Sequence, residues 1–404
     1  MPVEKIHIEQ FLELAKLHPV LDVRSPGEYL HAHMPGAHSL PLFSDEERKI
    51  VGTAYKQESR EAAIKLGLDY FGPKMKRMVE EVESLFNKRP AVAGDPDPAG
   101  RRLSGIALVH CWRGGMRSAG VAWLLDLYGF KVYTLVGGYK FFRRFVLRQF
   151  EEPFDFKILG GYTGSGKTEV LKQLAKAGER VIDLEALANH KGSAFGNIGM
   201  PAQPSQEMFE NLLAVKLYRA MVSDQRLAGS VANNGWPMSE SRFVVERESS
   251  TTHSSVIWLE DESQRIGSVN LPQPFWLKMR SSPVYFMDIP FRERLKHIIE
   301  EYGRLDKEKM IAAVERIQKR LGGLETKTTI RLLGEEKTED AFRILLKYYD
   351  KWYLKGLHNR EKAEELSTRI ELSGLNAIEN ARMLIQAIKK QSNQKKIVDE
   401  PGYG

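Results

Sequence analysis

The feature that most constrains this chain is an eight-residue segment that follows a short apolar run. The apolar run is Phe156–Gly160, and the segment behind it, Gly161–Thr168, reads Gly-Tyr-Thr-Gly-Ser-Gly-Lys-Thr. Val170, Leu171 and Leu174 then recur at helical spacing. In a strand, loop and helix of this kind, backbone N–H groups and the helix N-terminus surround a phosphate. The sequence therefore predicts a phosphate-binding loop in an α/β domain with a parallel sheet.

Residues of this loop have distinct expected roles. The glycines let the backbone curl so that successive N–H groups point inward at a phosphate. Lys167 is expected to reach the terminal phosphate, and the Thr168 hydroxyl is expected to hold Mg²⁺ if the ion is bound. The expected diphosphate-binding residues of the loop are Gly161, Thr163, Gly164, Ser165, Gly166, Lys167 and Thr168.

A second apolar run, Val256–Leu259, ends in the carboxylates Glu260, Asp261 and Glu262. This is the arrangement of a Walker B strand, in which a carboxylate holds Mg²⁺ or activates a nucleophile. The alternative interpretation is a strand that runs into an ordinary charged loop. Arg265 follows at once and is a candidate for a second contact to the diphosphate.

The chain of 404 residues contains one cysteine, Cys111, so an intramolecular disulfide and a site with several thiolates are both excluded. Cys111 follows a buried-strand candidate, Ile106–His110, and precedes a predicted helix. A thiol between a strand end and a helix N-terminus, with Arg113 and Arg117 beside it, is favoured as the thiolate. The sequence therefore predicts that Cys111, Arg113 and Arg117 form a reactive site.

Composition restricts the setting of this chemistry. Lysine and arginine (60) outnumber aspartate and glutamate (53), which gives a formal net charge of +7 and is compatible with a polyanionic partner. The N-terminus lacks an apolar leader, and no apolar run approaches the roughly 18 residues needed to cross a bilayer. We therefore expect a cytoplasmic protein without a membrane partner.

Breaks in the pattern suggest four regions. We expect domains over 1–150 and 151–290, a helical extension over 291–390 and a disordered tail over 391–404. The first joint is placed at Phe150–Asp155, because Glu151-Glu152-Pro153 ends the preceding helix. A surface loop is expected over Pro90–Gly105 and a strand over Phe243–Glu246.

The predicted helical extension is both cationic and aromatic. Its helices present either an ordinary solvated face or a surface that contacts RNA, where cations meet phosphates and aromatics stack on unpaired bases. The residues in question are Arg316, Lys319, Arg320, Lys327, Tyr348, Tyr349, Trp352 and Tyr353.

The first region resembles a rhodanese domain. The resemblance is carried by Asp22-Val23-Arg24, Pro35-Gly36-Ala37, His110-Cys111 with Arg117-Ser118, and Gly137-Gly138-Tyr139. It implies that Cys111 carries a persulfide or, by analogy, a selenium species. Five residues separate Cys111 from Arg117, whereas the usual sulfurtransferase loop has four. Five is the spacing of the related dual-specificity phosphatases of cell-cycle type, so loop length leaves open a chalcogen or a phosphorylated ligand.

A rhodanese-like region followed directly by a phosphate loop resembles one family, the tRNA 2-selenouridine synthases. The resemblance extends over nearly the whole chain. The segments that carry it are His110–Ser118, Gly161–Thr168, His190–Gly196, Pro204–Gln206 with Glu210-Asn211, and Trp258–Ser263 with Arg265–Gly267. The fold it implies is α/β, with an N-terminal rhodanese-like parallel-sheet domain, a central P-loop NTPase-like parallel-sheet domain and a C-terminal helical region.

The resemblance implies a transferase that replaces sulfur by selenium in 2-thiouridine at the anticodon wobble position of tRNA. Its implied substrates are selenophosphate, which another enzyme supplies, and geranyl diphosphate, which gives an S-geranyl intermediate. ATP is not expected to be required. Two alternatives stay open: a P-loop kinase or ATPase with a regulatory rhodanese-like or phosphatase-like module, and a non-enzymatic RNA-binding module.

Overall fold

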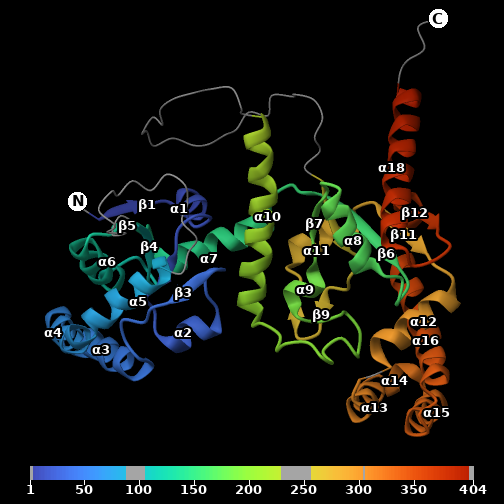
Figure 1. The fold of residues 1–404 in the computed structure, drawn as a ribbon, viewed down its shortest axis with the longest axis horizontal. Coiled ribbons are helices and arrows are strands. Elements are labelled where there is room, and N and C mark those ends of the chain that lie inside the picture. The colour runs from blue at the N-terminus through green and yellow to red at the C-terminus, as the bar shows by residue number, and fades with distance from the viewer. Residues whose placement is uncertain (1–2, 88–104, 229–255, 304, 400–404) are drawn as a thin grey trace, which may run out of the picture. The chain divides into compact units, whose positions relative to one another are not determined.

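The computed structural model describes residues 3–87, 105–228, 256–303 and 305–399 (Figure 1). The chain divides into two compact units. Unit 1 comprises the residues up to 149 together with 207–215, and unit 2 comprises 150–206 and the residues from 216 onward. Most of the predicted surface loop, 90–104, and the predicted strand Phe243–Glu246 lie outside the described residues.

Unit 1 is built on a parallel sheet with the strand order β1-β5-β4-β2-β3. Its strands are β1 (Glu4–Ile6), β2 (Val20–Asp22), β3 (Ala37–Ser39), β4 (Ile106–His110) and β5 (Lys131–Leu135). Ala107, Leu108 and Val109 of the central strand are fully buried, as expected for a parallel strand covered on both faces. The end of β4 therefore delivers Cys111 from the most rigid part of the unit.

Helices cover this sheet. They are α1 (Ile8–Leu14), α2 (Pro26–His31), α3 (Asp45–Gln57), α4 (Arg60–Phe71), α5 (Met75–Asn87), α6 (Met116–Tyr128) and α7 (Gly138–Gln149). The core joins strand residues such as Val109 and Val132 to Val121 and Leu125 of α6 and Val82 of α5.

Unit 2 contains a second parallel sheet, with the order β12-β11-β6-β8-β7. Its strands are β6 (Asp155–Gly161), β7 (Arg180–Ile182), β8 (Val256–Glu260), β11 (Val284–Asp288) and β12 (Ser367–Glu371). A small antiparallel pair, β9 (Arg265–Ile266) and β10 (Val269–Asn270), lies outside this sheet. Because β6 and β8 are neighbouring parallel strands, the phosphate loop and the carboxylates after β8 meet at one sheet edge.

The helices of unit 2 form two groups in Figure 1. Near the sheet are α8 (Lys167–Lys176), α9 (Leu184–Ala188), α11 (Gln273–Arg280) and α18 (Ala377–Asp399). The second group, in orange tones, is α12 (Phe291–Tyr302), α13 (Lys307–Arg316), α14 (Gln318–Leu321), α15 (Gly323–Gly334) and α16 (Thr338–His358). The short helix α17 (Ala363–Leu366) contacts α16. The second group has its own apolar core, which includes Phe195, Phe342 and Leu345. No helix in the described ranges is long and apolar enough to span a membrane.

The α/β fold class is confirmed, but region boundaries differ from those predicted. Strand β12 and helix α18 lie in the stretch predicted to be a separate helical extension, yet β12 pairs with β11 and α18 packs on α8. The strand was missed because Ile370 is its one buried residue, so it carries no clear alternation. Residues 391–399, predicted as disordered, continue α18. Helix α10 (Gln206–Ala228) contributes 207–215 to unit 1, and its remaining residues belong to unit 2.

Candidate functional site

The phosphate loop joins the end of β6 to the start of α8, as the sequence predicts. Gly164 and Gly166 have φ angles of 79° and 69°, in the left-handed region that favours glycine. A Cβ atom on Gly164 would also lie 2.7 Å from the Ile298 side chain. The loop therefore depends on glycine at these two positions.

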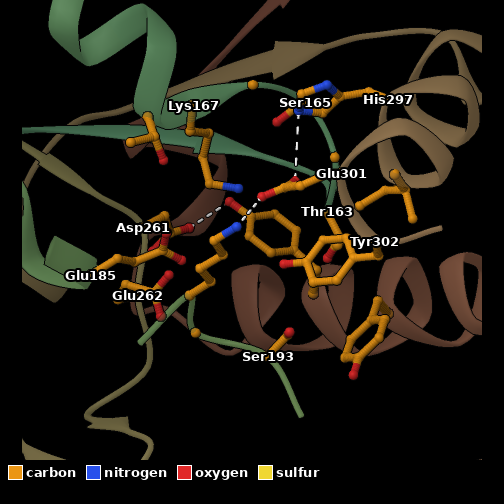
Figure 2. Close-up of a pocket in the computed structure, with 18 of the residues that line it drawn as sticks. Thr163, Ser165, Lys167, Glu185, Ser193, Asp261, Glu262, His297, Glu301 and Tyr302 are labelled. Atoms are coloured by element: carbon orange, nitrogen blue, oxygen red, sulfur yellow. Dashed lines mark hydrogen bonds and ion pairs between the residues drawn. The ribbon is translucent and has the colours of Figure 1, made fainter. Parts of the chain in front are cut away.

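Two polar side chains in the loop have the geometry of anion-binding groups. Lys167 Nζ donates to the Gly161 carbonyl oxygen at 2.9 Å, which holds the ammonium over the loop (Figure 2). Ser165 Oγ is buried and has no hydrogen-bond partner among the described residues. Since buried polar groups are nearly always paired, this hydroxyl is available for a phosphate oxygen.

Arg294 of α12 forms hydrogen bonds that fix the phosphate loop in position. Its guanidinium donates to the Thr163 carbonyl oxygen at 3.1 Å and makes two 2.8 Å bonds to the Asp350 carboxylate. It also lies 4.6 Å from the Tyr162 ring centroid. The side chain is 2% exposed, so this paired charge positions the loop and does not face the solvent. Sequence reasoning missed Arg294, because no spacing rule connects residues 163, 294 and 350.

Asp261 is the candidate Walker B residue whose two carboxylate oxygens both accept hydrogen bonds from other side chains. Asp261 Oδ2 accepts a 2.6 Å hydrogen bond from the Tyr353 hydroxyl, and Arg360 donates to Oδ1. The Tyr353 oxygen in turn accepts the Gly161 N–H at 3.2 Å. Asp261 thus links α16 to the first residue of the phosphate loop. The sequence offered Tyr353 only as a candidate RNA-contacting aromatic, and Arg360 was not singled out.

The other two carboxylates of this strand end behave differently from each other. Glu260 is fully buried, and its Oε2 accepts the Leu184 N–H at 2.9 Å, so it is a structural residue of the sheet edge. Glu262 faces Glu185, and both lie beside the cavity near Lys167 (Figure 2). Burial and the neighbouring Glu185 raise the pKa of Glu262 well above its usual range. Burial also raises the pKa of Glu185, so the site disfavours simultaneous ionisation of the two carboxyl groups.

These residues line a cavity of about 1020 Å³ within unit 2. The loop from Thr163 to Thr168 lines it, and a group of aromatic side chains, here called the aromatic wall, lines it as well. The wall consists of Tyr302, Tyr348, Tyr349 and Trp352. Arg320 lies beside it, with its guanidinium 5.4 Å from the Trp352 ring centroid. All four aromatics that the sequence offered as part of an RNA-contacting surface, Tyr348, Tyr349, Trp352 and Tyr353, therefore line the same cavity as the phosphate loop.

A small apolar recess adjoins the aromatic wall. It is lined by Thr163, Ser193, Phe195, Ile298, Tyr302, Phe342, Leu345, Leu346 and Tyr349. Tyr349 is held in place because its hydroxyl oxygen accepts the Ala194 N–H at 3.3 Å. The cavity is therefore bordered both by the phosphate loop and by aromatic and apolar side chains.

The residues of this cavity fit a Mg²⁺ ion only in a limited way. In the described part of the chain, no group of three or more His, Cys, Asp or Glu side chains is arranged to hold a metal ion. Mg²⁺ bound through phosphates needs only one or two protein oxygens, and Thr168 and Glu262 line the cavity as such donors. An ion held by these two residues would neutralise phosphate charge.

The thiol of unit 1 lies in a tightly bonded loop. Cys111 is 3% exposed, and its Sγ is 3.3 Å from the Ser118 Oγ. The Tyr139 N–H donates to the Cys111 carbonyl oxygen at 2.9 Å. Gly138 has a φ of 57°, and a Cβ atom there would lie 2.3 Å from that same oxygen. The Gly137-Gly138-Tyr139 segment therefore fixes the start of the thiol loop.

The two arginines predicted to flank the thiol have different environments. Arg117 Nη1 donates to Glu28 Oε2 at 2.9 Å, and Arg48 contacts the same oxygen at 3.0 Å. Burial opposes ionisation of Glu28, but the hydrogen bond and charge of Arg117 hold its pKa below the usual value. Arg113 is exposed to solvent. The described contacts of Arg117 are therefore with Glu28, and Arg113 remains accessible to a ligand.

A buried polar network contacts the ring and the hydroxyl of Tyr139. Arg24 pairs with Asp22 at 2.6 Å, and its guanidinium lies 3.7 Å from the Tyr139 ring centroid. The Tyr139 hydroxyl donates to Glu207 at 2.7 Å and accepts from Asn211 Nδ2 at 2.9 Å. Asn211, which belongs to the segment 207–215, thus lies in the interior of unit 1. Its part in the Glu210-Asn211 motif was noted in the sequence, but this role was not.

The structure brings together most, but not all, of the predicted cavity residues. Thr163 to Thr168, Asp261 and Glu262 line the cavity, whereas Gly161, Glu260 and Arg265 are not among its lining residues. Arg265 is exposed, and its Nε donates to the Gly267 carbonyl oxygen at 2.8 Å. A contact from Arg265 to a diphosphate stays a prediction.

Comparison with known proteins covers both units. A family model described as tRNA 2-selenouridine synthase AAA domain matches residues 154–228 and 240–374, and a rhodanese-like domain model matches 7–144. The tRNA 2-selenouridine synthase of Hydrogenovibrio crunogenus is 34% identical over 367 residues, covering 83% of this chain and 88% of that protein. Its namesake in Pseudomonas putida is 33% identical over 389 residues, covering 88% and 90%. That of Bdellovibrio bacteriovorus is 32% identical over 386 residues, covering 85% and 89%.

Proposed function

The chain belongs to the tRNA 2-selenouridine synthase family, and from this we propose that it converts wobble 2-thiouridine in tRNA to 2-selenouridine through an S-geranyl intermediate. Geranyl diphosphate is the proposed ligand of the cavity in unit 2. Selenophosphate is the proposed selenium donor, and Cys111 of unit 1 is the proposed nucleophile of the selenium step. The reaction takes place where tRNA and a selenophosphate-producing enzyme occur, in the cytoplasm.

The observation that carries the proposal is the mixed lining of the cavity in unit 2. Lys167 and Ser165 of the phosphate loop line it together with aromatic side chains, and an apolar recess adjoins it. Asp261 contacts Tyr353 and Arg360, in contrast to a Walker B carboxylate that holds Mg²⁺ through water. This combination favours a diphosphate with a hydrocarbon tail over a hydrolysed nucleotide.

In the first step, the 2-thiouridine sulfur attacks the carbon that carries the diphosphate. The new C–S bond forms, the C–O bond breaks, diphosphate leaves with the bonding pair, and the base releases its N3 proton. Lys167 and the loop N–H groups stabilise the negative charge that develops on the leaving oxygen. The aromatic wall stabilises positive charge on the allylic carbon through the faces of its rings.

In the second step, selenium attacks C2 of the base. The C2–S bond breaks and the geranyl group leaves as its thiol, which is a better leaving group than the sulfur of an unmodified thiocarbonyl. Phosphate is released when water cleaves the P–Se bond of the donor. The Cys111 thiolate first displaces the geranyl thiol from C2 and is then displaced by selenium, so the thiolate is regenerated without an oxidant, and Arg113 is the accessible cation beside it.

Mass spectrometry of wobble nucleosides tests the proposal. Incubation of the protein with 2-thiouridine tRNA and geranyl diphosphate should give S-geranyl-2-thiouridine, and addition of selenophosphate should convert it to 2-selenouridine. Saturable ATP turnover with no binding of geranyl diphosphate would overturn the proposal in favour of a kinase or ATPase.

A further inference from the structure

Trp112 is an aromatic side chain of the thiol loop that the proposed steps do not use. It directly follows Cys111, yet it is 37% exposed, whereas Cys111 is 3% exposed. One side of its indole packs on the Tyr139 ring, with the centroids 5.7 Å apart and the planes 35° apart. A large aromatic side chain is therefore held against the protein on one side and reaches solvent beside the nucleophile.

The support under Trp112 is rigid. Tyr139 is fully buried, and both its backbone N–H and its hydroxyl are hydrogen-bonded, to Cys111 and to Glu207. The Arg24 guanidinium lies on the Tyr139 ring at 3.7 Å. The Lys140 N–H fixes the Trp112 carbonyl oxygen at 2.9 Å. The orientation of the indole is thus set before a ligand arrives, which lowers the entropy lost when one binds.

Exposed cations accompany this indole. Arg113 is its chain neighbour, and Lys140 is bonded to its backbone; both side chains are exposed. An aromatic face with cations beside it is the combination that single-stranded nucleic acids use, since bases stack on the ring and phosphates contact the cations. A hydrocarbon chain would gain from the indole but nothing from the two charges.

We propose that Trp112 forms a stacking site for an unpaired nucleobase of the RNA substrate next to Cys111, with Arg113 and Lys140 on the adjacent phosphates. The inference rests on the proposed function for its RNA substrate, but it concerns unit 1 alone. It assigns to this loop a base-binding residue in addition to its nucleophile.

The test compares two replacements of Trp112 with a matched control. Trp112→Leu keeps an apolar side chain over Tyr139 but cannot stack on a base, whereas Trp112→Phe retains an aromatic ring. Trp123 is an exposed tryptophan on α6 of the same unit, so Trp123→Leu is the control. The selenium step is followed with an anticodon stem–loop that already carries S-geranyl-2-thiouridine.

Stacking contributes about 1–3 kcal/mol per base, so W112L should raise the KM for the stem–loop roughly 10- to 100-fold with a smaller change in kcat. W112F should stay within about 3-fold of wild type, and W123L should be unchanged. Quenching of tryptophan fluorescence by the stem–loop should be lost in W112F and kept in Trp123→Phe.

Three results would overturn the inference. The first is an unchanged KM in W112L, and the second is an equal rise of KM in W112F and W112L. The third is weaker binding of W112L only to stem–loops that carry the geranyl group, with stem–loops that lack this group bound as by wild type. The last result would assign Trp112 to the hydrocarbon chain. If the wild-type protein modifies no tRNA, the proposed function fails, and the fluorescence experiment still decides whether RNA binds at Trp112.

Discussion

The thiol loop and the phosphate loop share one architecture and differ in what they leave accessible. Each follows the central strand of a parallel sheet and leads into a helix, β4 into α6 and β6 into α8. Each also uses left-handed glycine, Gly114 in the first loop and Gly164 in the second. The thiol is buried and its loop is closed by internal hydrogen bonds, whereas the phosphate loop faces a cavity of about 1020 Å³. One strand–loop–helix design thus holds a buried thiol in one unit and a loop that faces a cavity in the other.

The two loops also depend on distant chain segments in different ways. Tyr139, which supports the thiol loop, is held by Glu207 and Asn211 at the start of α10. The phosphate loop is held by Arg294 of α12 and Tyr353 of α16. Each loop sequence is therefore local, but the framework that fixes its shape is not. Variants of one loop at a time therefore test whether each loop supports only one of the two proposed reaction steps.

The largest expected effect comes from Cys111→Ser. A serine hydroxyl is a far weaker nucleophile than a thiolate at neutral pH, so selenium transfer should fall by about 1000-fold or more. Geranylation should stay within about 2-fold of wild type, because Lys167 and the cavity lie in unit 2. Both steps are measured by mass spectrometry of wobble nucleosides. Equal loss of both steps would show that the two loops do not act separately.

The reciprocal variant is Lys167→Ala. Removing a cation from the developing diphosphate charge should slow geranylation by roughly 100- to 1000-fold. Selenium transfer to tRNA that already carries the geranyl group should be unchanged. Lys172→Ala is the matched control, since Lys172 lines the same cavity but pairs with Glu169 at 2.7 Å. Slowing of the pre-alkylated reaction by K167A would contradict the assignment of that step to unit 1.

Both loops were predictable from the sequence because their signals are local. The run Gly161–Thr168 determines the turn, the backbone N–H donors and the start of the next helix within eight residues. The position of Cys111 follows from the strand before it and the helix after it. The same is true of the fold class, since buried parallel strands such as Ile106–His110 read as continuous apolar runs.

The partners of these loops were not predictable. Arg294 contacts Thr163 across 131 positions of the chain, and Tyr353 contacts Gly161 across 192. An arginine or tyrosine on a charged helix looks like a surface residue until tertiary packing buries it. Glu260, Asp261 and Glu262 appeared equivalent in the sequence, and only their contacts to Leu184, Arg360 and Glu185 distinguish them.

A smaller effect should follow from Asn211→Ala, which tests how far the support of the thiol loop depends on α10. The substitution leaves the buried Tyr139 hydroxyl and Arg143 without one partner each. We expect unit 1 to lose about 2–3 kcal/mol of unfolding free energy, measured by hydrogen exchange at the amides of β4. Lys216→Ala, on the exposed side of the same helix, is the control and should change little. Faster exchange in β6 of unit 2, with unchanged exchange in β4 of unit 1, would show that Asn211 does not stabilise unit 1.

The smallest expected effect concerns the carboxyl pair that has no counterpart at the thiol loop. Glu262 has a pKa raised well above its ordinary value of 4.5, so between that value and the raised pKa the folded protein binds more protons than the unfolded chain. The unfolding free energy should therefore fall as pH increases through this window, and it should be independent of this group below pH 4.5. Glu262→Gln keeps a donor for Glu185 but removes the titration, so the stability of the variant relative to wild type should be greater at pH 8 than at pH 5. Thermal unfolding followed across this range measures the difference, with the exposed cavity residue Glu300→Gln as control. Parallel curves for E262Q and wild type would mean that the cavity is as open to water at Glu262 as at Glu300.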